Sequence, residues 1–126
     1  MIDCEWSHAI PLEPDDVFKA LSNSRRRQVI LSLARTEESV SASTLAVEIA
    51  EIENTDDTSR IMDEQLTRIY IDLTQVHLGM LDDLEVAQYD DRSKQVNATE
   101  ATKPLAGHLR RILCACYTPT EDSAEP

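Results

Sequence analysis

Residues 63–99 read DEQLTRIYIDLTQVHLGMLDDLEVAQYDDRSKQVNAT, and they predict a long helix followed by a β-hairpin. Successive residues of a helix lie 100° apart, so the side chains that this helix would turn toward a core can be projected from the sequence. One side of a helix over residues 63–84 collects Leu66, Tyr70, Leu73, His77, Met80 and Leu84. Strand-like runs on both sides of the turn-like residues 90–93 then predict two strands within residues 86–99.

Three shorter helices are predicted before this segment. The first starts at Glu13-Pro14, because proline suits the first helical turn. Asn23 is expected to cap the second, which runs to about residue 35. After a very short strand at Val40, Ser41 or Ser43 caps the third. Its expected core face consists of Leu45, Ala46, Ile49 and Ile52.

The order of three helices, a long helix, a hairpin and a last helix is that of a winged helix–turn–helix protein. The fold class expected is therefore mainly α with a small β-hairpin wing and an extra C-terminal helix. The predicted organisation is an irregular arm over residues 1–12, a winged helix–turn–helix domain over 13–100, a dimerisation helix over 101–117 and a disordered tail over 118–126.

Composition limits the function classes. The 126 residues include 24 acidic and 12 basic ones, so the net charge is -12, which ordinarily opposes binding to nucleic acid. Only three of the basic residues are lysine, and this pattern is also typical of proteins adapted to molar salt, where a strong negative field keeps them soluble. We therefore expect a halophilic, cytoplasmic protein. No apolar run is long enough to span a membrane, and two glycines cannot supply a glycine-rich phosphate loop.

Two motifs resemble a known family. Residues 16–33, DVFKALSNSRRRQVILSL, resemble the opening helices of haloarchaeal winged-helix proteins, which commonly show Leu-Ser-Asn-x-Arg-Arg-Arg. The pattern His77-Leu78-x-x-Leu81, followed by Val86-Ala87-x-Tyr89, is similar to the end of the reader helix and the first wing strand in ArsR-like regulators. The resemblance covers about residues 14–99 and implies a transcription regulator that is often dimeric.

The sequence departs from that pattern at two places. Glu85 stands where ArsR-like proteins usually have glycine before the first wing strand. Residues 53–62 also make the turn before the reader helix long and acidic.

The expected partner is double-stranded DNA, with helix 63–84 in the major groove and the wing over 86–99 on the flanking backbone. Arginine pairs with guanine, glutamine with adenine, and aspartate accepts from cytosine. Residues at the start of the third helix and at the wing tip are placed to contact phosphate. The candidate DNA-binding residues are Ser43, Thr44, Arg68, Ile71, Asp72, Gln75, Arg92 and Lys94. Each group also has an interpretation without DNA: the residues of helix 63–84 would form a solvated helix face, Ser43 and Thr44 would be helix caps, and Arg92 and Lys94 would be ordinary turn charges.

Other side chains leave two interpretations open. Arg25, Arg26 and Arg27 either contact phosphate or form structural ion pairs. His77 is expected to be buried and hydrogen-bonded to backbone. The last helix packs on its own domain or on a second copy, and its candidate dimerisation residues are Leu105, Leu109, Ile112, Leu113 and Cys116.

Three other functions are alternatives to DNA reading. A protein-interaction module on the same fold would not read DNA, and the acidity favours it. A metal- or redox-sensing regulator would use Cys4, His8, Cys114 and Cys116, but Cys-x-Cys spacing alone is a weak metal motif. No catalytic constellation is recognisable, so neither an enzyme nor a bound cofactor or metal is expected.

Overall fold

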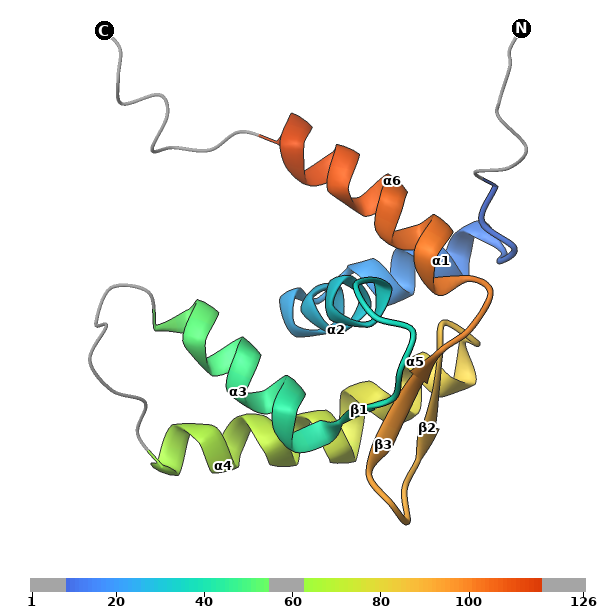
Figure 1. The fold of residues 1–126 in the computed structure, drawn as a ribbon. Coiled ribbons are helices and arrows are strands. Elements are labelled where there is room, and N and C mark those ends of the chain that lie inside the picture. The colour runs from blue at the N-terminus through green and yellow to red at the C-terminus, as the bar shows by residue number, and fades with distance from the viewer. Residues whose placement is uncertain (1–8, 55–62, 117–126) are drawn as a thin grey trace, which may run out of the picture.

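The computed structural model describes residues 9–54 and 63–116. It is mainly helical, with a small antiparallel sheet and a C-terminal helix, and so has the layout expected of a winged helix (Figure 1). In chain order the elements are α1 Pro14–Leu21, α2 Ser24–Ala34, β1 Val40–Ser41, α3 Ala42–Glu53, α4 Asp63–Asp72, the π-helical turn η2 Leu73–His77, α5 Leu78–Asp83, β2 Ala87–Asp90, β3 Gln95–Ala98 and α6 Thr102–Ala115.

The predicted helix starts are confirmed by their hydrogen bonds. Asn23 Oδ1 accepts from the backbone N–H of Arg25 at 2.8 Å and of Arg26 at 3.3 Å, so it caps α2. Ser41, not Ser43, caps α3, because its Oγ accepts from the Thr44 N–H at 3.1 Å. Local sequence therefore determines where these helices begin.

The sheet has the order β1-β3-β2, and both pairs are antiparallel. Val96 is fully buried at its centre, opposite Val40 on one side and Tyr89 on the other. The short strand expected at Val40 is thus real, and it joins the hairpin to the start of α3. This pairing fixes the wing against the helical part of the domain.

The connection between α5 and the wing uses a left-handed residue. Glu85 has φ 66°, its N–H donates to Asp82 O, and the Val86 N–H donates to Leu81 O. These two bonds form a Schellman motif, in which glycine normally occupies the left-handed position. Glu85 therefore adopts the backbone conformation that glycine would supply in ArsR-like proteins, at a conformational cost.

The core lies between α2, α3, the long helical run 63–83 and the first half of α6. Its largest fully buried side chains include Ile30, Leu33, Leu45, Ile49, Leu73, Leu81 and Leu105. The expected core face of α3 is confirmed except at Ile52, which is 48% exposed. Ile52 is in the last turn of α3, beyond the part of the helix that the core covers.

The long helix predicted over residues 63–84 is one helical run, but it is not α-helical throughout. At η2 the Leu78 N–H donates to Leu73 O, a bond across five residues. Within it, Thr74 Oγ1 donates to the Tyr70 carbonyl at 3.0 Å and so competes for an acceptor of the helix backbone. The helix is locally unwound there, so a uniform 100° projection does not give the directions across η2, although His77 is buried and Gln75 exposed as it predicts.

Some predictions lie outside the described residues. They are the arm over residues 1–8, most of the acidic turn 53–62, the disordered tail 118–126, and the roles of Cys4 and His8. Within the described ranges, no helix combines the length and the hydropathy that crossing a membrane requires.

Candidate nucleic-acid interface

Most of the predicted DNA-binding residues occupy one side of the molecule. Arg68, Ile71 and Gln75 are exposed on the run that begins with α4, and Ser43 and Thr44 are exposed at the start of α3. In Figure 1, α4, the start of α3 and the β2–β3 turn lie at one end of the molecule, and the end of α6 lies at the other. We call the side formed by Ser43, Thr44, Arg68, Ile71, Gln75, Arg92 and Lys94 the reading face.

Asp72 does not belong to it, and its predicted outward orientation is wrong. Its Oδ2 lies 3.0 Å from Arg25 Nη1 and 2.9 Å from His77 Nε2. In an α-helix residues five apart differ by about 140° in direction. The π turn brings them onto one side, which is why Asp72, although its side chain is 34% exposed, is bound by His77.

Arg25 joins α2 to two other helices. Its Nε and Nη2 each lie 2.8 Å from a carboxylate oxygen of Glu53, at the end of α3, and its Nη1 reaches Asp72. These carboxylates, Glu53 foremost, raise the pKa of Arg25 above its ordinary value. Arg25 therefore neutralises the charge of Asp72, which is the only acidic residue within residues 65–81.

Arg26 and Arg27 are engaged by the end of α1. Arg26 is 7% exposed, and it donates to the carbonyls of Lys19 (2.8 Å) and Ala20 (3.3 Å). Arg27 Nη1 donates to the carbonyl of Leu21 at 2.7 Å. Helix C-termini leave such carbonyls without intrahelical donors. All three arginines are therefore engaged within the domain, but only Arg25 forms the structural ion pairs that were one of the two interpretations, because Arg26 and Arg27 donate to neutral groups.

His77 is buried, as expected, but its partners are side chains and not backbone. Nε2 faces Asp72, and Nδ1 lies 3.1 Å from Arg26 Nη1, which can only donate. The neutral tautomer with hydrogen on Nε2 satisfies both contacts. Burial foremost, with a smaller contribution from Arg26 and Arg25, lowers the pKa of His77 below its ordinary value, although Asp72 opposes the shift.

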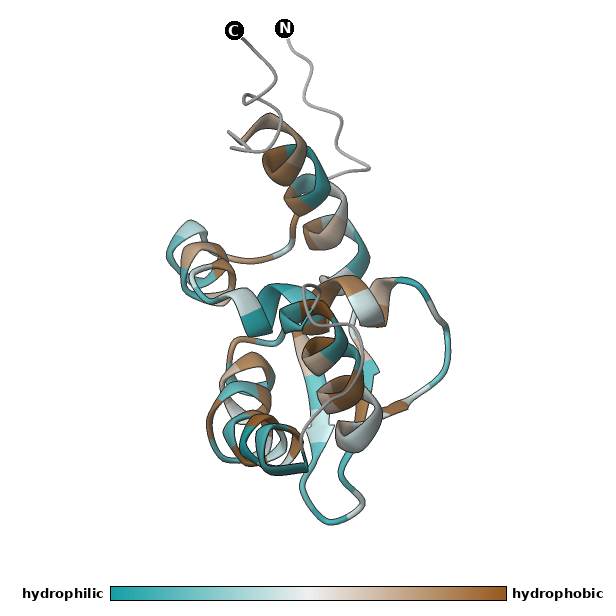
Figure 2. Cartoon of the chain, turned by 90° about the vertical axis from the view of Figure 1, so that its left-hand side faces the viewer, coloured by the Kyte–Doolittle hydropathy of each residue, from teal (hydrophilic) through white to brown (hydrophobic). Residues whose placement is uncertain are grey.

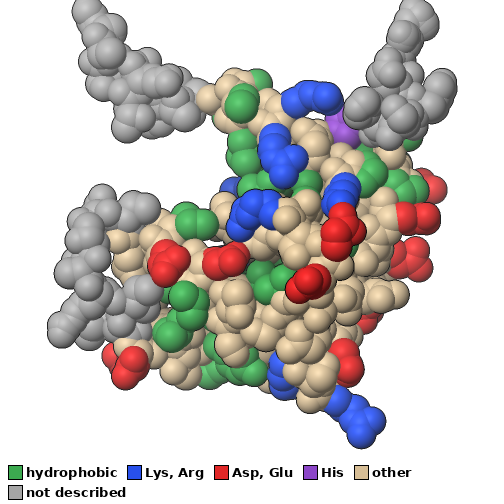
Figure 3. All heavy atoms as spheres, viewed as in Figure 1, with side chains coloured by type: hydrophobic (Ala, Val, Ile, Leu, Met, Phe, Trp, Pro, Cys, Tyr) green, Lys and Arg blue, Asp and Glu red, His purple; other side chains and the backbone are tan. Residues whose placement is uncertain are grey.

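At the tip of the wing the two predicted cations differ. Lys94 Nζ lies 2.8 Å from Asp91 Oδ1, and this hydrogen-bonded pair raises the pKa of Lys94 and lowers that of Asp91. Asp90 accepts from the backbone of Arg92 and from Ser93 Oγ, each at 3.0 Å. Over the described ranges no hydrogen bond or ion pair engages the Arg92 guanidinium, so it is available to bind a partner. Figure 3 shows basic side chains protruding at this end of the molecule.

The predicted apolar stripe of α6 is divided between two environments. Leu105 and Leu109 are buried in their own domain, so the prediction that they contact a second copy is wrong. Ile112 and Leu113 are 48% and 40% exposed, and Cys116 is exposed after them. Figure 2 shows this end of α6 extending away from the rest of the described chain, because no other element packs on it there.

The cysteines do not form a metal centre in the part of the chain that the structure describes. Cys114 and Cys116 are free and exposed. No group of three histidine, cysteine or carboxylate side chains gathers within residues 9–54 and 63–116. The sensing hypothesis therefore stays a prediction that involves Cys4 and His8.

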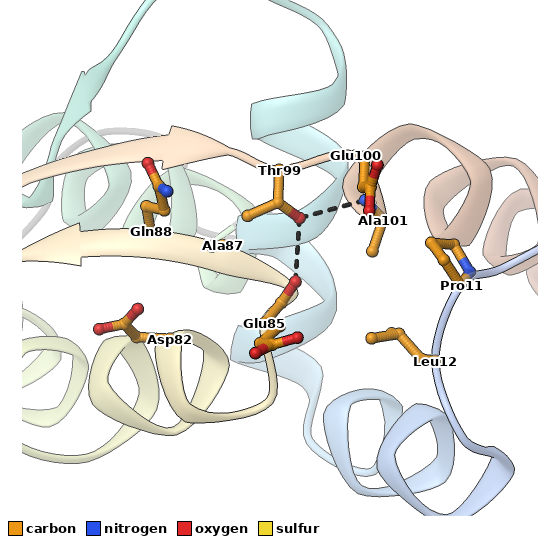
Figure 4. A pocket seen from close by; sticks show the side chains of 9 residues that line it. All are labelled: Pro11, Leu12, Asp82, Glu85, Ala87, Gln88, Thr99, Glu100 and Ala101. Carbon is orange, nitrogen blue, oxygen red and sulfur yellow. Dashed lines mark hydrogen bonds between the residues drawn. The ribbon is translucent and has the colours of Figure 1, made fainter.

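One hollow was not foreseen from the sequence. It has a volume of about 340 Å³ and lies between the end of α5, the start of β2 and the start of α6 (Figure 4). Thr99 Oγ1 bridges its wall by donating to Glu85 O at 2.9 Å and accepting from the Ala101 N–H at 3.1 Å. Asp82, Glu85 and Glu100 line it without a basic residue, so it disfavours anionic ligands such as phosphate.

Comparison with known proteins gives one match. Residues 18–97 match the model of a family described as a domain of unknown function. The curated proteins and the solved structures yielded no match.

Proposed function

The chain belongs to that family, DUF7344, and from its geometry we propose that it is a DNA-binding transcription regulator of the winged helix–turn–helix type. In this proposal the helical run over residues 63–83 enters the major groove, and the wing contacts the flanking backbone. The resemblance to ArsR-like haloarchaeal proteins supports the same function. A halophilic, cytoplasmic setting is part of the proposal, because the acidic composition suits it.

The observation that carries the proposal is that the one acid at the centre of the reading face is paired with a cation. Over residues 67–76 the exposed side chains are Thr67, Arg68, Ile71, Gln75 and Val76. The one carboxylate of this segment, Asp72, keeps 34% of its side-chain surface exposed but is bound to Arg25 and His77. A stretch whose single acid is paired with an arginine, in a chain of net charge -12, suits an anionic partner.

Two arginine substitutions test this function. Arg68→Ala is expected to change which sequences are selected and to cost about 1–3 kcal/mol on the preferred site, because it removes a base contact. Arg92→Ala is expected to weaken binding to all sequences alike, because it removes a phosphate contact. Selection from random duplexes and fluorescence anisotropy in molar KCl measure both effects.

Arg35→Ala is the matched control, since it removes one positive charge at the end of α2, away from the reading face. It should leave both sequence preference and affinity within experimental error. If wild-type protein is folded and binds no duplex at any salt concentration, the proposal is wrong and the protein-interaction module is favoured.

We also propose that the regulator is a homodimer joined through the exposed end of α6. Two readers related by a twofold axis match a palindromic site, and Ile112 and Leu113 present apolar surface that the domain leaves uncovered. Ile112→Asp is expected to convert the dimer to a monomer in sedimentation equilibrium at micromolar concentration, because a charge would be buried at the interface.

Val47→Asp places the same charge on an exposed apolar position of α3 and is expected to leave the dimer intact. A wild-type protein that is monomeric at all concentrations contradicts the dimer but not DNA binding. Dimerisation that survives Ile112→Asp places the interface elsewhere.

A further inference from the structure

One large apolar side chain of the reading face, Ile71, and a second beside it, Val76, have no base or phosphate group assigned to them above. Ile71 is 51% exposed and Val76 is 47% exposed, both on the helical run that begins with α4. They lie five residues apart, the separation across η2 that also brings Asp72 and His77 together. The π turn therefore rotates Val76 toward the side of Ile71.

The surroundings of this apolar pair indicate the chemistry of its partner. Arg68 precedes Ile71 by three residues and Gln75 directly precedes Val76, so each apolar side chain has a neighbour that can hydrogen-bond a base edge. The one carboxylate of this stretch, Asp72, is paired with Arg25, which reduces its repulsion from the negative potential of a DNA groove. The only apolar group that a base pair presents in the major groove is the C5-methyl of thymine.

We propose that Ile71 and Val76 bind thymine methyl groups and make the protein selective for thymine next to the guanine contacted by Arg68. The inference rests on the proposed DNA-binding function and names the bases that the reading face selects. The seven helical steps from Arg68 to Gln75 rise by about 10 Å along the helix, which is roughly three base-pair steps. The expected core of a half-site is therefore a guanine and an adenine about three steps apart, with the thymine of Ile71 between them and that of Val76 beside the adenine.

The test compares thymine with deoxyuridine, which lacks only the methyl group and keeps every hydrogen-bonding group. The probe is the duplex that wild-type protein most enriches from a pool with a random centre, resynthesised with deoxyuridine at one thymine at a time. At one or two positions the wild-type affinity is expected to fall about fourfold, the value of one buried methyl-sized group. The T-to-U affinity ratio is measured by anisotropy in molar KCl.

Ile71→Ala and the double variant Ile71→Ala/Val76→Ala are expected to bring this ratio to about one at those positions. Both substitutions are at exposed sites, so the fold is retained, and the ratio within each variant is independent of any general loss of affinity. Phe18→Ala, at a 68% exposed apolar position of α1, is the control and should keep the wild-type ratio.

The outcomes separate this inference from the function on which it rests. Selective binding by wild-type protein with equal affinity for thymine and deoxyuridine overturns the inference and leaves DNA binding intact. A T-to-U ratio that persists in Ile71→Ala/Val76→Ala overturns it as well, because the methyl then acts through DNA shape. Absence of selective binding in folded wild-type protein overturns both.

Discussion

Arg26→Leu is expected to lower the free energy of unfolding by about 3–5 kcal/mol, because the guanidinium satisfies several buried acceptors at once. It donates to two carbonyls at the end of α1, to Ser22 Oγ at 2.9 Å and toward His77 Nδ1. Leucine fills part of the space but donates to none of them. Urea unfolding in molar KCl, followed by circular dichroism, measures the change.

Arg68→Leu is the matched control. Arg68 is exposed and has no structural contact of this kind among the described residues, so its effect on stability should stay within about 0.5 kcal/mol. Arg26→Lys should fall between the two, since an ammonium reaches only some of the same acceptors. A loss of less than about 1 kcal/mol for Arg26→Leu would show that water replaces the guanidinium and that the buried network is not needed for stability.

Acidification is expected to destabilise the protein through His77. The groups that face its imidazole are Asp72, Arg26 and, more distantly, Arg25, and burial together with the two arginines lowers the pKa of His77 despite Asp72. Between the ordinary value of 6.5 and the lower folded value, the unfolded chain binds the proton and the folded protein does not. The contribution of His77 is therefore complete above pH 6.5 and is lost as the pH falls, with a slope of at most about 1.4 kcal/mol per pH unit.

Comparison with His77→Gln between pH 8 and pH 5.5 isolates this effect. Glutamine keeps a donor for Asp72 and an acceptor for Arg26 but does not titrate, so its unfolding free energy should vary less with pH than that of the wild type. Parallel pH curves for wild type and His77→Gln would mean that His77 is protonated equally in the folded and unfolded states.

Much of the fold follows from short-range sequence signals. Pro14, Asn23 and Ser41 mark helix starts because each acts on backbone groups within a few residues of itself. The turn 90–93 and its flanking strands are likewise local, and they predict the hairpin correctly. The exposed positions of Arg68, Ile71 and Gln75 are also predicted correctly, since they precede η2 or lie at its outer side.

The errors concern contacts between elements distant in sequence and one change in helical pitch. Asp72 was expected to be available on the reading face because a helical projection does not show that Arg25 of α2 binds it, or that a π turn brings His77 beside it. Leu105 and Leu109 were grouped with Ile112 and Leu113 because one stripe along α6 does not reveal where the domain beneath it ends. The same reason explains Ile52, which continues the apolar face of α3 beyond the core.

By itself, the sequence determined the element order, the helix caps, the hairpin and the ridge that holds Arg68 and Gln75, because hydrogen-bond capping and side-chain periodicity act over a few residues. Only the tertiary structure decided which charges remain available. It directs Arg25, Arg26 and Arg27 to Glu53, Asp72, His77 and the end of α1, and it leaves Arg92 without such partners within the described residues. Those pairings join residues up to 51 positions apart, and no local pattern specifies which helices are brought together.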